Sequence, residues 1–200
     1  MTPGVQPYYS YTLADEKGKI IKKSRLLKCK SFTRNFMALI QMGLTGKLAN
    51  FYNSGGVNHP QADWYTTAES VNGYTGYKQG YDIIIGGDTR TPAITDNWLY
   101  SQISTLTAAG LSIGAVQTTA AVPSDIPPTP GTNYYDMSKV FTNTTGSPVN
   151  VNEIGLYVRY LSSYSYIDWY FLLIRDVLPG TVTVANGQTM TLKYTIRAVI

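Results

Sequence analysis

The chain has 200 residues, which is long enough for one domain with a substantial core, and its formal net charge is +4. Only 14% of its residues are charged, against roughly 25% in an average soluble domain. A single cysteine, Cys29, excludes an intrachain disulfide and a zinc site of the CxxC type, and no apolar run reaches the ~20 residues of a membrane span.

Tyrosine occurs 17 times and glycine 18 times. Tyrosine is enriched where proteins meet, but it also fills strand positions well. Low charge with many uncharged polar residues is typical of an extracellular or particle-assembled β protein. Residues 1–13 lack the basic and apolar regions of a secretory signal, so we expect synthesis in a cytoplasm and, if the protein ends outside the cell, release with a particle.

Residues 1–30 are predicted to form an extended arm followed by a basic segment. Pro3, Gly4 and Pro7 mark the extended part, and the tyrosines around them are candidate subunit contacts: Tyr8, Tyr9 and Tyr11. Eight of the 16 basic residues follow within one short stretch, namely Lys17, Lys19, Lys22, Lys23, Arg25, Lys28, Lys30 and Arg34.

This basic stretch is opposed locally only by Asp15 and Glu16, so most of the net charge lies here. Five of its residues form a candidate basic partner surface: Lys22, Lys23, Arg25, Lys28 and Lys30. A solvated face, an acidic partner protein and nucleic acid all fit such a cluster. No aromatic residue stands between Lys17 and Lys30, which disfavours stacking on single-stranded bases.

Residues 31–200 are predicted to form a single β-sandwich domain that includes one amphipathic helix, from Phe32 to Met42. Apolar residues recur there at helical spacing, Ser31 can cap the first turn, and Gly43 marks the end. The apolar stripe fits a face packed on a sheet; the alternative is an inter-subunit helix with Phe32 and Phe36 as contacts.

The region from Leu48 to Gly80 is rich in glycine, asparagine and aromatic residues, which predicts long exposed loops. A stacking surface for a host-surface glycan or a partner would use five candidate aromatics: Trp64, Tyr65, Tyr74, Tyr77 and Tyr81. A structural loop held by tyrosine packing is the alternative. Further on, residues 82–85 and 111–118 are predicted strands, Thr95 is predicted to start a short helix, and four prolines make residues 123–131 a loop.

The last third of the chain predicts an antiparallel β core with strands at residues 149–157, 170–174, 181–184 and 189–197. A break is predicted at residues 178–180, and Asn186-Gly187 is predicted to make a tight hairpin turn. Glu153 falls on the face opposite Ile154, where we expect solvent exposure; a buried ion pair with an arginine is the alternative.

Several segments of the chain carry a family resemblance. They are Phe141–Gly146 with Val151–Leu156, Arg175–Leu178, Val184 with Gly187–Ile196, and, further upstream, Ser31–Phe36 and Ile83–Thr89. Together they resemble small virion structural proteins of tailed bacterial and archaeal viruses, which include capsid decoration, neck and tail components. The resemblance implies a non-enzymatic particle subunit whose partners are other copies of itself and other virion proteins.

The motifs for catalysis are incomplete. Gly110–Gly114 spells G-x-S-x-G, but a nucleophile elbow needs a strand-turn-helix and a histidine after the serine, and the sole histidine, His59, precedes it. The acidic residues show no calcium-loop or glycosidase spacing, and Gly86-Gly87 lacks the lysine of a P-loop. Asn143-Thr144-Thr145 spells a glycosylation acceptor without a secretory route. We therefore expect no catalytic residue, cofactor or metal.

Taken together, the sequence predicts a mainly β protein, an antiparallel and jelly-roll-like β-sandwich with one N-terminal helix and long loops. We expect it to assemble into a tailed-virus particle through protein–protein contacts. One rival is a receptor- or carbohydrate-binding module that uses the tyrosine-rich loops. The other is a nucleic-acid-contacting particle component that uses the basic segment.

Overall fold

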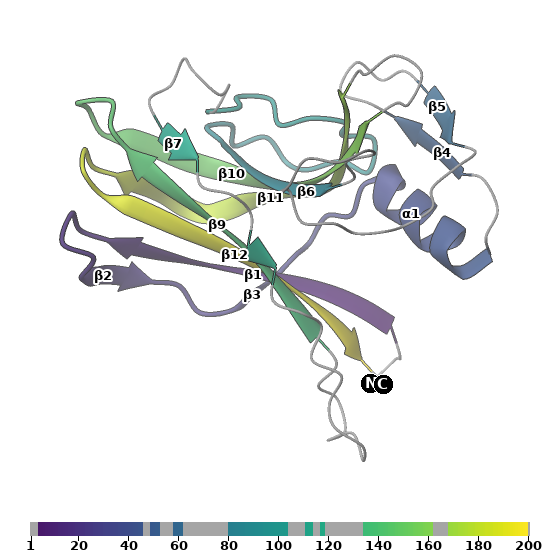
Figure 1. Ribbon diagram of the computed structural model, residues 1–200, viewed down its shortest axis with the longest axis horizontal. Coiled ribbons are helices and arrows are strands. Elements are labelled where there is room, and N and C mark those ends of the chain that lie inside the picture. The colour runs from purple at the N-terminus through teal and green to yellow at the C-terminus, as the bar shows by residue number, and fades with distance from the viewer. Residues whose placement is uncertain are drawn as a thin grey trace. The chain divides into compact units, whose positions relative to one another are not determined.

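The computed structural model describes residues 4–45, 49–52, 58–61, 80–103, 111–113, 117–118, 134–161 and 168–199. They form a mainly β protein with antiparallel sheets and one short helix (Figure 1). The first of two compact units comprises Met1–Cys29, Leu106–Val149 and Thr183–Ile200, and the second comprises Lys30–Thr105 and Asn150–Val182. The chain leaves the first unit after Cys29 and enters the second at Lys30, next to the division predicted after residue 30. The single domain predicted over residues 31–200 stays a prediction. Within the described part, no helix has the length and apolar character needed to cross a membrane.

The first unit is built on a seven-stranded sheet. Its path is β2–β1–β12–β9–β7, with β3 also paired to β1 and β8 to β9. All these pairings are antiparallel. The strands are β1 (Gly4–Ala14), β2 (Ile20–Lys23), β3 (Leu27–Lys28), β7 (Leu111–Ile113), β8 (Gln117–Thr118), β9 (Tyr134–Asn143) and β12 (Thr189–Val199).

Alternation along the three central strands of this sheet puts their apolar side chains on one face. Tyr9 lies opposite Tyr194, which lies opposite Met137, and all three are buried. The other face is polar: there Asp136 accepts hydrogen bonds from Lys193 Nζ at 2.8 Å and from Thr195 Oγ1 at 2.6 Å. The strand predicted at residues 189–197 is confirmed, since β12 covers it.

The extended arm predicted at the N-terminus is wrong, because residues 4–14 are an inner strand of the sheet. β1 pairs with β12 along its whole length and with β2 and β3 on its other side. Tyr9, Tyr11 and Leu13 are consequently buried. Pro7 has no amide hydrogen, and its nitrogen lies on the side of β1 that faces the short strand β3. On that side the Pro7 carbonyl still accepts a 3.0 Å hydrogen bond from the Cys29 amide.

The turn predicted at Asn186-Gly187 is present, and Gly187 has a φ of +80°, which glycine adopts without a Cβ clash. The turn is closed by a 3.0 Å hydrogen bond from the Gln188 amide to the Ala185 carbonyl. The predicted hairpin is wrong, however. β12 follows this turn, but its two edges pair with β1 and β9, whereas the preceding strand β11 (Asp168–Val184) pairs with β10.

A buried asparagine, Asn143, holds the end of β9 against this turn. Its side-chain amide donates to the carbonyls of Val184 at 2.7 Å and Ser147 at 2.8 Å. Its side-chain oxygen accepts from the amide of Thr145 at 3.0 Å and from the Thr145 hydroxyl at 2.8 Å. Both amide hydrogens and the oxygen are thus engaged, and the side chain is 0% exposed. Asn143, the first residue of the glycosylation motif, therefore has a structural role: its side chain holds the corner between β9 and the turn.

The second unit contains a three-stranded sheet in the order β11–β10–β6, with β6 at Gly80–Gly86 and β10 at Val149–Leu161. Helix α1 spans Arg34–Thr45, and strands β4 (Ala49–Tyr52) and β5 (Asn58–Gln61) pair as a hairpin. Short segments cover both outer edges of the three-stranded sheet: Phe32 bridges Ile174 beside β11, and Gln102 bridges Gly86 beside β6. Covered edges do not template pairing with another chain.

Three features of the second unit differ from those predicted. Helix α1 spans Arg34–Thr45 rather than Phe32 to Met42: Thr33 instead donates its backbone amide to the Leu173 carbonyl at 3.0 Å, and the helix continues past Gly43. The break predicted at residues 178–180 is absent, and β11 runs through Pro179, whose fixed φ is compatible with extended backbone. No helix starts at Thr95, since residues 87–103 form a loop.

Candidate functional site

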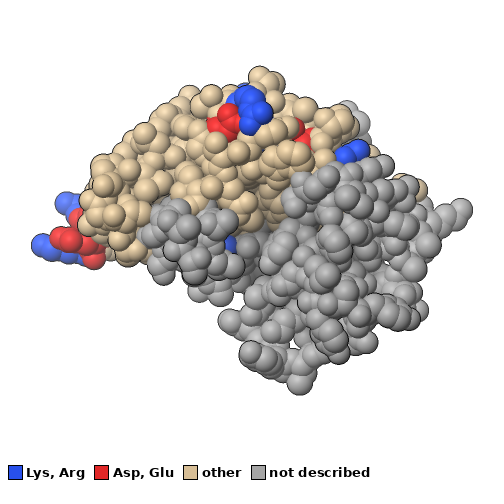
Figure 2. All heavy atoms as spheres, turned by 90° about the horizontal axis from the view of Figure 1, so that it is seen from above, with Lys and Arg blue, Asp and Glu red and all other residues tan. Residues whose placement is uncertain are grey.

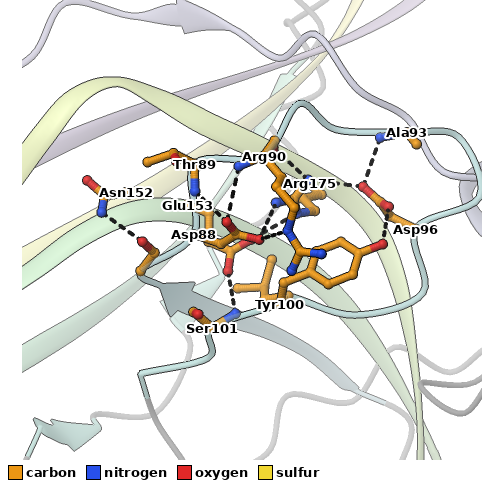
Figure 3. Close-up of polar contacts among 12 residues, drawn as sticks. Asp88, Thr89, Arg90, Ala93, Asp96, Tyr100, Ser101, Asn152, Glu153 and Arg175 are labelled. Carbon is orange, nitrogen blue, oxygen red and sulfur yellow. Dashed lines mark hydrogen bonds and ion pairs between the residues drawn. The ribbon is translucent and has the colours of Figure 1, made fainter.

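Buried charged side chains in the second unit converge on Arg175 of β11, whose side chain is 0% exposed (Figure 3). Its Nε donates to Glu153 Oε2 at 2.8 Å, and its Nη1 donates to Asp96 Oδ2 and to the Arg90 carbonyl, both at 3.1 Å. Its Nη2 lies 3.7 Å from Asp88 Oδ2. We call this set, with Tyr100, the arginine network: Arg175, Glu153, Asp96, Asp88, Arg90 and Tyr100.

Glu153 of β10 is 0% exposed, so its predicted solvent exposure is wrong and the alternative, a buried pair with an arginine, is correct. The carboxylate joins strand to loop, because its second oxygen accepts the Ser101 amide at 3.0 Å. On the neighbouring strand β6, the residue opposite Glu153 is Gly86, and the Glu153 side chain fits there because glycine has no Cβ. A Cβ built on Gly86 would lie 2.6 Å from Glu153 Cγ, well inside ordinary contact distance.

Two aspartates attach the loop at residues 87–103 to the same guanidinium. Asp96 accepts the Ala93 amide at 2.8 Å and the Tyr100 hydroxyl at 3.0 Å, in addition to Arg175. Asp88 accepts its own neighbours' amides, Thr89 at 2.7 Å and Arg90 at 3.2 Å, and pairs with the Arg90 side chain. Every oxygen of the three carboxylates in the network therefore accepts a hydrogen bond.

The ionisation of the loop side chains follows from these contacts. Desolvation raises the pKa of Asp88, but hydrogen bonds from the Arg90 side chain and from the amides of Arg90 and Thr89 outweigh it, so the pKa lies below its usual value of 3.8. The hydrogen bond to Asp96, followed by burial, raises the pKa of Tyr100 above its usual value of 10.0. The Arg90 guanidinium lies 3.5 Å from the centre of the Tyr100 ring, which places a cation on the aromatic face.

Apolar contacts fix the same loop on the sheet. Leu99 is buried in a cluster with Ile84, Tyr157 and Leu172, and its amide donates to the Tyr157 hydroxyl at 2.8 Å. Burial raises the pKa of that phenol above its usual value of 10.0. A Cβ on Gly155 would meet both Leu99, at 3.0 Å, and Leu172, at 3.1 Å. The loop thus packs tightly on the sheet at Leu99.

The chemistry of the arginine network is that of a structural clamp. A general base or a metal ligand needs a lone pair directed at an open site, whereas these carboxylate oxygens point at backbone amides, a phenol and guanidinium groups. Among the described residues, no group of three or more His, Cys, Asp or Glu side chains is placed to hold a metal ion. The outward side of the loop carries Ile94, Trp98 and Tyr100 as exposed large hydrophobic residues.

The structure places the predicted subunit contacts in different environments. Tyr9, Tyr11 and Phe36 are buried within the chain, so they are not free to contact a neighbouring subunit. Tyr8 is partly exposed on the polar face of the seven-stranded sheet, 5.1 Å from the Arg197 guanidinium. Phe32 is partly exposed and its ring lies 4.4 Å from that of Phe36.

The five residues of the candidate basic surface are all exposed. Lys22 and Lys23 lie in β2, Arg25 and Lys28 follow along the same edge of the first unit's sheet, and Lys30 begins the second unit. Four of the candidate ligand-loop aromatics, Trp64, Tyr65, Tyr74 and Tyr77, lie outside the described residues, as does the side chain of Tyr81. The ligand-loop assignment stays a prediction.

The two motifs considered for catalysis lie in strands. Ser112, the serine of the G-x-S-x-G spelling, sits in β7 opposite Thr142, which is extended pairing rather than the strand-to-helix turn of a nucleophile elbow. His59 lies in β5 opposite Phe51. Cys29 is buried, at 3% exposure.

Sequence reasoning missed the arginine network as a unit. It considered a buried ion pair of Glu153 with an arginine as an alternative, and a charged residue within an apolar strand is the sequence signal for such a pair. The partners Asp88 and Asp96 come from a loop about eighty residues earlier, and no local spacing connects them to Arg175. The chain matches no protein-family model, no curated protein and no solved structure.

Proposed function

We propose that this chain is a non-enzymatic structural subunit of a tailed-virus particle, joined to its neighbours by protein–protein contacts. The proposal rests on the sequence resemblance together with one feature of the surface: large apolar side chains are exposed in local groups. In the first unit Ile20 and Ile21 are 59% and 50% exposed, and in the second Ile94 and Trp98 are 63% and 38% exposed. Neighbouring exposed apolar residues are typical of surfaces that another protein covers.

The low charge of the surface supports the same proposal. Figure 2 shows a face on which most described residues are uncharged, with the charged ones gathered in a few small groups. In the second unit, the arginine network holds Trp98 and Tyr100 on a loop that is fixed at several points. Tryptophan, tyrosine and arginine are the residue types that dominate binding energy at protein interfaces, and a fixed loop loses little entropy on binding.

The finer fold is part of the proposal. We expect the chain to form a jelly-roll-like antiparallel β-sandwich, because the seven-stranded sheet has one apolar face and consecutive residues of β11, from Phe171 to Asp176, are all buried. A sandwich of this kind is a common building block of particle proteins. Solving the structure by crystallography or electron microscopy tests this point directly.

The mass of the full chain in solution, measured by light scattering, tests the assembly function. We expect one closed oligomer, such as a ring or a trimer. Replacing Ile94 and Trp98 together by serine is expected to shift the mass toward that of the monomer. Thr91→Ala and Thr95→Ala, at exposed positions in the same loop, serve as the matched control and leave the mass unchanged. Deleting residues 1–30 is unsuitable, because it removes β1 from the middle of its sheet.

Two results would contradict the proposal. One is a monomer at every concentration that also fails to bind purified particles of the virus encoding it. The other is turnover of a small-molecule substrate by the purified chain.

A further inference from the structure

We infer that the edge segment Ile20–Lys28 of the first unit binds an acidic, partly apolar segment of a neighbouring protein. This inference rests on the proposed function, since it names the kind of neighbour that one surface of the subunit accepts. It starts from the position of the segment. β2 ends the path of the seven-stranded sheet, and each of its four residues is exposed.

The edge segment is held in place by the chain itself. Asp15 organises the preceding turn by accepting the amides of Lys17 at 3.0 Å and Lys19 at 2.8 Å. Further along, Ser24 is tied to Tyr11 twice: its amide donates to the Tyr11 carbonyl at 2.9 Å, and its hydroxyl accepts the Tyr11 amide at 2.8 Å. A partner therefore meets a largely preformed surface.

The charge of this surface is uncompensated. Residues 15–28 carry two acidic residues, Asp15 and Glu16, and six exposed basic residues: Lys17, Lys19, Lys22, Lys23, Arg25 and Lys28. Within the described residues, none of the six forms an ion pair. The Asp15 carboxylate is engaged by backbone amides. Lys22 Nζ lies 5.7 Å from the centre of the Tyr11 ring, but an acidic partner gains attraction to these cations without first breaking an ion pair among the described residues.

The apolar residues of the segment decide which kind of acidic partner fits. Ile20, Ile21 and Leu26 are 59%, 50% and 37% exposed among the cations. The backbone of nucleic acid offers phosphates but nothing that buries an isoleucine, and the segment has no aromatic side chain on which bases could stack. A protein segment that alternates acidic and apolar side chains satisfies both features.

The same edge disfavours a second copy of this chain. Two such segments would bring two clusters of cations together, which is repulsive. The edge is also irregular: Lys22 pairs with Leu13 and Ile20 pairs with Ala14, so Ile21 is an extra residue without a partner on β1. Lysines and bulges are the devices by which sheets avoid pairing with their own copies. The segment is therefore selective for an acidic partner.

Fluorescence anisotropy with three labelled probes tests this inference on the full chain. The probes are a peptide of alternating Glu and Val residues, a Lys/Val peptide of the same length, and single-stranded DNA of matched charge. We expect the Glu/Val peptide to bind and the Lys/Val peptide not to bind. Replacing Lys22, Lys23 and Arg25 together by glutamine is expected to weaken Glu/Val binding roughly tenfold or more.

Two further variants separate charge from apolar contact. Ile20→Ser with Ile21→Ser is expected to weaken Glu/Val binding roughly fivefold to tenfold, because buried apolar area is lost. Lys22→Arg, Lys23→Arg and Arg25→Lys together preserve the charge and should retain binding. That variant excludes a general effect of three substitutions on folding.

Tighter binding of DNA than of the Glu/Val peptide, unaffected by the isoleucine changes, would overturn the inference in favour of nucleic acid. Absence of binding to all three probes at low salt would overturn it as well. Because peptide binding is measured on a single chain, its outcome is independent of the oligomeric mass. A monomer that binds the peptide contradicts the proposed assembly alone, and an oligomer that does not bind it contradicts the inference alone.

Discussion

The seven-stranded sheet of the first unit and the three-stranded sheet of the second place their ion pairs in different environments. In the first unit the ion pair of Lys193 with Asp136 stays on the polar face, where the lysine side chain is 41% exposed. In the second unit Arg175 and Glu153 are both 0% exposed and are joined to a loop. Alternation keeps this pair off the apolar face, where Lys139 is the buried charged residue of β9, with its Nζ 5.6 Å from the centre of the Phe141 ring. The second unit buries an ion pair and joins it to loop side chains and backbone amides, which ties the loop to the sheet.

The largest expected difference between the two regions comes from removing one cation from each. Arg175→Met leaves Glu153 and Asp96 buried without their guanidinium, which is expected to cost about 3–5 kcal/mol of unfolding free energy. Lys193→Met removes an exposed partner and is expected to cost at most about 1 kcal/mol. Urea denaturation of both variants measures the contrast. Equal losses would mean that the arginine network is not the clamp described here.

A glycine next to the network gives the next largest effect. Gly86→Ala places a Cβ against the Glu153 side chain, which cannot move without leaving Arg175 or Ser101, and overpacking of this kind costs about 1–3 kcal/mol. Gly180→Ala is the matched control, because nothing lies within 4 Å of a Cβ built there. Thermal unfolding compares the two. Equal melting temperatures would show that Glu153 relocates freely.

In the first unit, the stability of the fold depends on the buried polar side chain of Asn143. Asn143→Ala leaves the Val184 carbonyl without its donor and the Thr145 amide without its acceptor, which is expected to cost about 1–3 kcal/mol. Asn186→Ala removes a single exposed acceptor from the Gly146 amide and is expected to cost less. A loss for Asn186→Ala as large as that for Asn143→Ala would contradict the role of Asn143 as the corner. Chemical denaturation ranks the pair.

The smallest effect concerns pH. The pKa of Asp88 is lower in the folded protein than its usual value of 3.8, so this carboxylate stabilises the fold above about pH 4 and the contribution is lost as the pH falls through the folded pKa. The stability difference between the natural chain and Asp88→Asn is therefore expected to close on acidification. A difference that stays constant from neutral pH to pH 3 would contradict this assignment. Urea midpoints over that range measure it.

A region of this chain is predictable from its sequence where a local residue pattern determines its structure, and not where contacts between distant residues do. The strands at residues 149–157 and 189–197 are predicted correctly, because an alternating pattern is local and each strand carries its own. β1 carries the same alternation in Tyr9, Tyr11 and Leu13, but the prolines concealed it. The arginine network depends on a long-range meeting between Arg175 and the loop at residues 87–103, and pairing across that distance has no local pattern.

The pairing of Gly4 with Val199 has a consequence for how the first unit folds. β12 lies between β1 and β9, so the sheet lacks a central strand until the last part of the described chain has left the ribosome. Contacts this distant in sequence slow folding, since the entropy of closing the chain is lost before they form. β1 must wait unpaired on its β12 side while the second unit is synthesised. Refolding from urea is therefore expected to be slow, with a rate set by the closure of β1 onto β12.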